Sequence, residues 1–198
     1  MTESFKSLRN CVELHREQGN AFVIKTFREA ASFQKERQVY GLLQGKLPCA
    51  RVLWAEGNAL ALSQLPGKNL VECLEEQERT GLPQWDMWEK LVVWLTEFQK
   101  LTGYIMTDVN LRNFLYDEKT QTLYGVDFEE CRAGSMAACA GGVAAFVRLY
   151  RPENTPLKQE ISQFMLRLFA RYLEMEVDVL FLESARREAM LLQRRNRK

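Results

Sequence analysis

The residues best suited to chemistry on phosphate groups fall in three short strings, well separated along the chain. In the first, Lys25 closes the apolar run 22–24. In the second, Asp108 precedes Asn113 by five positions, and in the third Asp127 follows another apolar strand. A strand-end cation and several hard oxygen donors are the groups that bind phosphates and a divalent ion. Each string alone is common, so the information lies in their order.

Transfer of a phosphoryl group from ATP depends on positioning and electrostatics more than on covalent help from the protein. It requires cations on the phosphates, Mg²⁺ held by oxygen ligands, and a carboxylate that orients the acceptor hydroxyl. We expect Asp108, at the entrance of a loop, to face the acceptor, and Asn113 and Asp127 to hold Mg²⁺. Arg112, in the same loop, is expected to neutralise charge on the transferred group or on a substrate.

Lys25 needs a partner, because an unpaired lysine at a strand end would be mobile. Glu36 lies near the middle of the next predicted helix and is the candidate. Glu29 is also possible, but it lies too close to the strand end to reach back comfortably. The competing interpretation gives each residue a separate, common role: an exposed lysine, turn-forming Asp and Asn residues, or a helix-capping Asp. Five suitable residue types in the right order favour one joint site.

The surrounding elements must bring these residues together. Apolar patterns and turn signals predict strands at 9–16, 21–27, 51–54 and 59–65, and a helix at 30–44. Pro66 and Gly67 then interrupt the pattern and predict a boundary between two lobes, residues 1–65 and 66–198. Beyond it we expect a paired set of strands at 114–116 and 123–126, and helices at 70–79, 83–101, 144–150, 157–174 and 178–194. The strand pair would place Asn113 near Asp127.

Composition excludes several other classes of function. The chain has 198 residues, of which 46% are apolar and 27% charged, with a formal net charge of +1, as in an ordinary globular protein. Its single histidine argues against a histidine-based triad or a multi-histidine metal site. The five scattered cysteines predict reduced thiols and a cytoplasmic protein. No apolar run approaches the roughly 20 residues that cross a bilayer, so we expect no membrane partner.

These strings resemble those of the protein-kinase-like superfamily, and the resemblance extends over nearly the whole chain. Lys25 and Glu36 resemble the lysine that binds ATP and its helix partner, and the stretch 63–70 resembles the hinge. This implies that Gln64 and Leu65 contact the nucleotide. Asp108 resembles the catalytic base, and Asn113 and Asp127 the metal ligands. In its small size the chain is similar to the RIO-like and tRNA-modification-complex kinases and to the aminoglycoside and choline phosphotransferases.

The resemblance implies an α+β, two-lobed fold, with a shortened β-rich N-lobe and a mainly helical C-lobe. It also implies an ATP- and Mg²⁺-dependent phosphotransferase that acts on a hydroxyl of a small molecule or protein. The nucleotide is expected in a cleft between the lobes, with Lys25 as its roof. The acceptor itself is not specified by the sequence.

The chain also departs from the family pattern. No glycine-rich loop precedes Lys25, and little room remains there for another strand, so we expect an open cleft and weak nucleotide binding. Met106 stands where a histidine is usual, and Ser135, Cys139 and Ala140 lie where aspartates often occur. The alternative hypothesis is therefore a catalytically weak or inactive kinase-like protein that binds nucleotide or acts as a scaffold.

The C-terminal end is basic. Its cations are Arg186, Arg187, Arg194, Arg195, Arg197 and Lys198. Such an end can bind the phosphates of RNA, but cations are also favoured in the last turn of a helix and in a solvated tail. No interleaved aromatic residues support an RNA-binding surface, so RNA is the less favoured partner.

Overall fold

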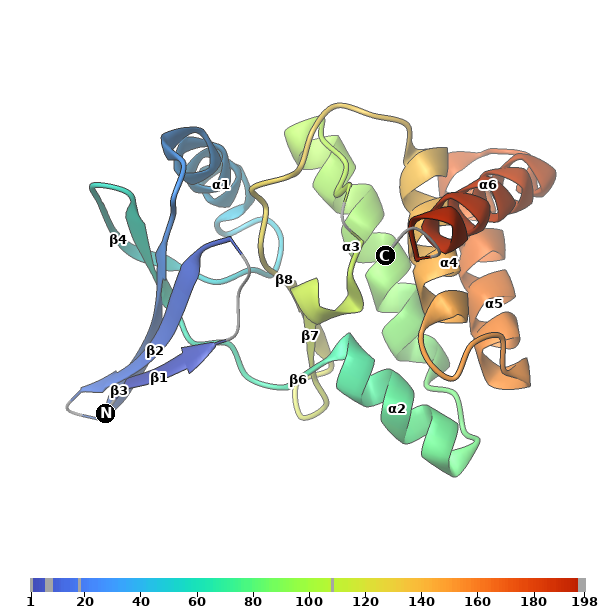
Figure 1. The fold of residues 1–198 in the computed structure, drawn as a ribbon, viewed down its shortest axis with the longest axis horizontal. Helices are drawn as coiled ribbons and strands as arrows, with labels where there is room; N and C mark the ends of the chain where they lie inside the picture. Colours follow the sequence, from blue (N-terminus) through green and yellow to red (C-terminus); the bar gives the residue numbers. More distant parts are fainter. Residues whose placement is uncertain (1, 6–8, 18, 108, 196–198) are drawn as a thin grey trace.

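A computed structural model describes residues 2–5, 9–17, 19–107 and 109–195 of the chain. Figure 1 shows a β-rich N-lobe on one side and a mainly helical C-lobe on the other. The N-lobe contains strands β1 (Thr2–Phe5), β2 (Cys11–Glu17), β3 (Asn20–Thr26), β4 (Val52–Glu56) and β5 (Ala59–Ser63), and helix α1 (Ala30–Leu43). The expected α+β class is therefore confirmed.

The N-lobe sheet is antiparallel, with strand order β1-β2-β3-β5-β4. Lys25 lies near the end of central strand β3, between Val12 of β2 and Leu60 of β5. The expectation that little room remains for a further strand is wrong, because Thr2–Phe5 forms β1 against β2. Four residues suffice for this strand because a short edge strand needs pairing on one side only.

Helix α1 packs against the sheet through residues spaced three and four apart. Phe33, Val39, Tyr40 and Leu43 on this face are buried, as helical periodicity requires. The same face also buries a charged residue, Glu36. A buried ionisable side chain in an otherwise apolar stripe needs a hydrogen-bonding or oppositely charged partner nearby. The sheet against which α1 packs is where such a partner can lie.

The chain passes to the C-lobe after β5 ends at Ser63. Strand β6 (Lys68–Asn69) pairs with β7 (Phe114–Asp117), which in turn pairs with β8 (Thr122–Gly125). Gly67 has φ 97°, and a Cβ atom there would lie 2.2 Å from the carbonyl oxygen of Tyr116. Only glycine fits this crossing. The predicted division into residues 1–65 and 66–198 agrees with where the first sheet ends but stays a prediction.

The C-lobe is built from helices around a shared apolar core. They are α2 (Leu70–Thr80), α3 (Trp85–Thr102), the short 3₁₀ helix η1 (Leu111–Asn113), α4 (Met136–Leu149), α5 (Pro156–Leu173) and α6 (Val177–Arg195). The core continues into the N-lobe, since Tyr40 and Phe128 meet at 4.9 Å between ring centroids. Helix α4 begins well before the expected residue 144, because its Ala- and Gly-rich first half is buried between neighbouring helices.

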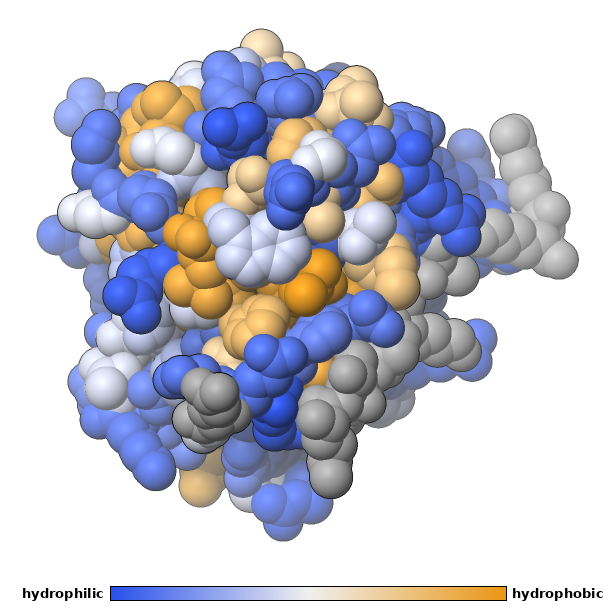
Figure 2. Space-filling view, turned by 90° about the vertical axis from the view of Figure 1, so that its left-hand side faces the viewer, coloured by the Kyte–Doolittle hydropathy of each residue, from blue (hydrophilic) through white to orange (hydrophobic). Residues whose placement is uncertain are grey.

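No helix in the described ranges is long and apolar enough to cross a membrane. The exposed large apolar side chains of the N-lobe include Leu53 and Trp54 on β4. Figure 2 faces this side of the molecule and shows apolar residues gathered in its middle, with hydrophilic residues around them.

Candidate functional site

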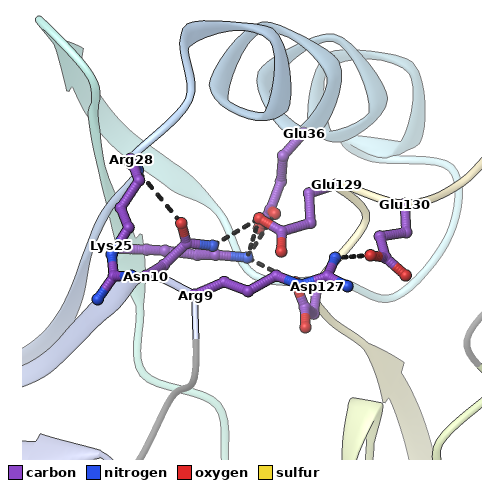
Figure 3. Close-up of polar contacts among 8 residues, drawn as sticks. All are labelled: Arg9, Asn10, Lys25, Arg28, Glu36, Asp127, Glu129 and Glu130. Carbon is purple, nitrogen blue, oxygen red and sulfur yellow. Dashed lines mark hydrogen bonds and ion pairs between the residues drawn. The ribbon is translucent and has the colours of Figure 1, made fainter.

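Lys25 lies at the centre of a group of carboxylates between the two lobes (Figure 3). Its Nζ atom donates to Glu36 at 2.6 Å and to Asp127 at 2.5 Å, and lies 3.6 Å from Glu129. Lys25 is 7% exposed and Glu36 only 1%, whereas the Asp127 side chain is 44% exposed. One cation therefore joins the sheet, helix α1 and the segment after β8.

The electrostatics of the group follow from this burial. Burial alone would lower the pKa of Lys25, but the carboxylates of Glu36 and Asp127 outweigh it and raise that pKa. Burial raises the pKa of Glu36 to about 7, against the opposing effect of Lys25 and with added repulsion from Asp127. The group is thus held together by one ammonium, and its acidic members compete for that ammonium.

The local chain geometry explains how Asp127 reaches this position. Its backbone has φ 65°, the left-handed region that Asp tolerates better than most residues. The next residue, Phe128, is fully buried and packs on Tyr40 and Phe98. This anchor lets the residues on either side, Asp127 and Glu129, project toward Lys25.

Asn113 is brought to the same place by the β7–β8 hairpin. Its carbonyl oxygen accepts a hydrogen bond of 2.9 Å from the Val126 amide, directly before Asp127. The two residues that we expect to hold Mg²⁺ therefore lie on adjacent backbones, as the strand pairing predicts. Their function as metal ligands stays a prediction.

The donor set fits a hard divalent cation. Glu36, Asp127 and Glu129 each offer a carboxylate oxygen, all within 4.8 Å of one another. Among the described residues, buried Oε1 of Glu36 has no hydrogen-bond partner. Carboxylate oxygens are the ligands that Mg²⁺ prefers. The chemistry of these side chains is thus compatible with the metal that a phosphoryl transfer requires.

For the other residues predicted from the sequence, the structure describes no contact with the Lys25 group. Asp108 lies outside the described residues. The exposed Arg112 lies 5.9 Å from the ring of Tyr150, at the end of α4, and its described contacts do not include the Lys25 group. Gln64 is exposed and Leu65 half-buried, in the connection between β5 and β6. Their expected nucleotide contacts stay predictions.

Sequence reasoning missed a second set of contacts between the lobes. Asn10 donates to Glu129 at 2.5 Å, and Arg9 forms an ion pair with Glu130 (Figure 3). Both residues lie directly before β2, so this end of the N-lobe sheet is joined to the segment after Asp127. The sequence signal for these contacts was weak: two acidic residues, Glu129 and Glu130, follow Phe128, and the polar Arg9 and Asn10 could pair with them. The expected open cleft and weak nucleotide binding stay predictions.

A cavity of about 230 Å³ lies beside these contacts. Arg9, Asn10 and Glu129 line it, together with residues from the start of α1. It is smaller than the roughly 300–1,000 Å³ of typical ligand pockets.

No family model matches the chain, and no curated protein matches it in sequence. Solved structures do match. The kinase PK-1 of Cydia pomonella granulovirus has a TM-score of 0.52 and 18% identity, over 67% of this chain and 52% of that one. The bifunctional kinase-methyltransferase WbdD has a TM-score of 0.55 and 14% identity, over 90% of this chain and 47% of WbdD.

A second structure of WbdD, in complex with the kinase inhibitor LY294002, has a TM-score of 0.55 and 15% identity, over 86% of this chain and 45% of that one. The chain thus spans about half the length of these structures. At such low identity the likeness concerns the fold alone, and it agrees with the two-lobed arrangement. The chain has a protein-kinase-like fold.

Proposed function

We propose that this protein is an ATP- and Mg²⁺-dependent phosphotransferase of the cytoplasm that acts on a hydroxyl group. The observation that carries the proposal is the position of Lys25, which bonds to Glu36 of one lobe and Asp127 of the other. A buried lysine held this way presents a fixed positive charge at the interface, where it can bind the phosphates of a nucleotide.

Each residue has a defined part in this proposal. Glu36 holds the Lys25 ammonium on the nucleotide phosphates, while Asn113 and Asp127 bind Mg²⁺, which neutralises charge on the phosphate oxygens. Asp108 orients the acceptor hydroxyl and accepts its proton. In the same step the bond between that oxygen and the γ-phosphorus forms, and the bond from phosphorus to the departing ADP breaks.

The test is release of ADP by the pure protein with ATP and Mg²⁺. We expect Asp127→Asn to lower kcat/KM by about 100-fold or more, the scale of a lost electrostatic contact in a transition state. Asp178→Asn, which makes the same change on the exposed first turn of α6, should leave the rate unchanged. Full activity of the Asp127→Asn protein would contradict the proposal.

A second candidate is a nucleotide-binding protein or scaffold of the same shape without turnover. It is favoured by the connection between β1 and β2, which contains no glycine and is bonded to Glu129 and Glu130. Thermal unfolding separates the two, because a ligand that binds the folded state raises Tm. A rise in Tm with ATP and Mg²⁺, without ADP release for any acceptor, would favour this candidate.

A further inference from the structure

A large cavity lies mainly in the C-lobe, beside the residues on either side of Asp108 in the chain. Its volume is about 1000 Å³, and Thr107 and Val109, the neighbours of Asp108, are part of its wall. The segment 130–135 and helices α4 and α6 complete it. A molecule in this cavity would therefore contact Thr107 and Val109, the chain neighbours of the residue to which we assign the acceptor hydroxyl.

The cavity is strongly cationic. Four arginines line it against a single glutamate: Arg9, Arg132, Arg187 and Arg194 against Glu130. The whole chain has a net charge of only +1, so this concentration is local. Arg9 pairs with that glutamate, and Arg187 pairs with Glu183 of its own helix at 3.3 Å. In the part of the chain that the structure describes, Arg132 and Arg194 have no carboxylate within ion-pair distance.

A helix end adds to this charge. Helix α4 begins in the cavity wall, where Ser135 caps it by accepting a hydrogen bond from the Ala137 amide. The N-terminal end of a helix carries a partial positive charge and favours anions. Its 14 residues give α4 the length for this effect. The arginines and the helix end thus act in the same direction.

The arginines of α6 are held in place by close packing on α4. A Cβ atom at Gly141 would lie 2.8 Å from backbone atoms of Glu183 and Ser184, so glycine permits this approach. Arg148 of α4 then donates to Ser184 and Glu188 of α6, at 3.0 and 2.6 Å. The backbone that carries these arginines is thus held by α4 before any ligand binds.

We propose that this cavity is the acceptor site and that it takes a small molecule bearing a phosphate monoester as well as the hydroxyl to be phosphorylated. This inference rests on the proposed function. Arginine binds phosphate through two parallel N–H donors, and the volume lies at the upper end of small-molecule pockets. Apolar residues in the wall, including Ile105, Phe146 and Met190, can cover a carbon skeleton.

The first experiment uses inorganic phosphate as the probe, without nucleotide and with a chelator present. Calorimetric titration of the wild-type protein should show binding that the double variant Arg187→Gln/Arg194→Gln weakens about ten-fold or more. Arg186→Gln is the matched control, because this neighbour on α6 is exposed and is not part of the cavity wall. It should change the Kd by less than about two-fold, as for a surface charge.

Two outcomes overturn the site. One is no binding by the wild-type protein up to about 50 mM phosphate, well above millimolar affinity. The other is equal affinity in the double variant, provided its Tm equals that of the wild type. Because no ATP is present, loss of phosphate binding and loss of ADP release are separate results. An inactive protein that binds phosphate at these arginines would refute the phosphotransferase and keep the anion site.

The second experiment decides the size of the ligand. We expect glycerol 3-phosphate to compete with inorganic phosphate for the wild-type protein, and glycerol to have no effect. A polyglutamate peptide or a single-stranded RNA that binds at least about ten-fold more tightly than glycerol 3-phosphate, and loses this in the double variant, would overturn the small-molecule assignment in favour of a macromolecule.

Discussion

Two charged regions of the molecule are built in opposite ways. In the first, one cation, Lys25, is buried among three carboxylates. In the second, the cavity beneath α6, Arg9 pairs with Glu130 and Arg187 with Glu183, whereas Arg132 and Arg194 are exposed and have no described carboxylate partner. In the first region the cation already has carboxylate partners within the fold. The second has charge left over for a ligand.

The difference follows from the cost of removing a charge from water. A buried ion needs a partner within the protein, because desolvation costs several kcal/mol, and so Lys25 and Glu36 must come together when the chain folds. An exposed arginine is stabilised by water and needs no internal partner. Pairing therefore indicates where the structure depends on charge, and unpaired cations indicate where charge is available for recognition.

The largest effect is expected from Lys25→Met. It leaves Glu36 buried beside Asp127 without its cation, which should lower the free energy of unfolding by about 3–5 kcal/mol. Urea denaturation measures this. The double variant Lys25→Met/Glu36→Leu should recover much of the stability, since it removes both charges, while activity stays absent. If the double variant is as unstable as the single one, the buried pair does not hold this region together.

A smaller effect concerns pH. Since the folded-state pKa of Glu36 is raised from 4.5 to about 7, the folded protein binds more protons in this window. The stability that the protonated Glu36 carboxyl contributes is therefore lost as pH rises from 4.5 to 7. Relative to the wild type, Glu36→Gln should gain stability over this range, by at most about 1.4 kcal/mol per pH unit.

The measurement is urea denaturation of both proteins at a series of pH values, in the presence of a chelator. Lys25, Asp127 and Glu129 surround Glu36 in both proteins, so the difference between the two curves isolates the one carboxyl group. A difference that does not change with pH, or that falls as pH rises, would contradict the raised pKa.

The smallest expected effect is the response to salt. Exposed charges are screened at a Debye length of about 10 Å in 0.1 M salt, and buried ones much less. Chloride should therefore weaken phosphate binding at the arginines by a few-fold, without a comparable loss of stability in the Lys25 group. Titrations with phosphate at low and high sodium chloride test the binding, and melting curves at the same salt concentrations test the stability. Salt-independent phosphate binding would place the anion elsewhere than at exposed arginines.

Local patterns were enough to predict much of the fold. The strands on either side of Lys25, helix α1 with Glu36, and the β7–β8 hairpin all have clear periodicity or turn signals within a short window. Strand β1 was missed because four residues at an edge give too little pattern. The start of α4 was missed because its Ala- and Gly-rich first half is stabilised by burial between helices, which no local propensity reports.

The site shows the same division. Asp127 was predicted because it directly follows an apolar strand, whereas Glu129 joins the group only because Phe128 is buried and turns its neighbours toward Lys25. Asn10 contacts Glu129 across 119 positions. The arginine-lined cavity draws on four separate parts of the chain. Such distant contacts are properties of tertiary packing, and a single sequence contains no direct signal for them.

Arg9 belongs to the walls of both cavities, the small one beside Lys25 and the large one beneath α6. It is the N-lobe contribution to a site that is otherwise formed by the C-lobe. An anion bound to Arg9 and to the α6 arginines at once would favour one arrangement of the lobes over others. Any nucleotide that favours a particular arrangement would then be linked to that anion. By thermodynamic reciprocity, each would change the affinity for the other by the same factor.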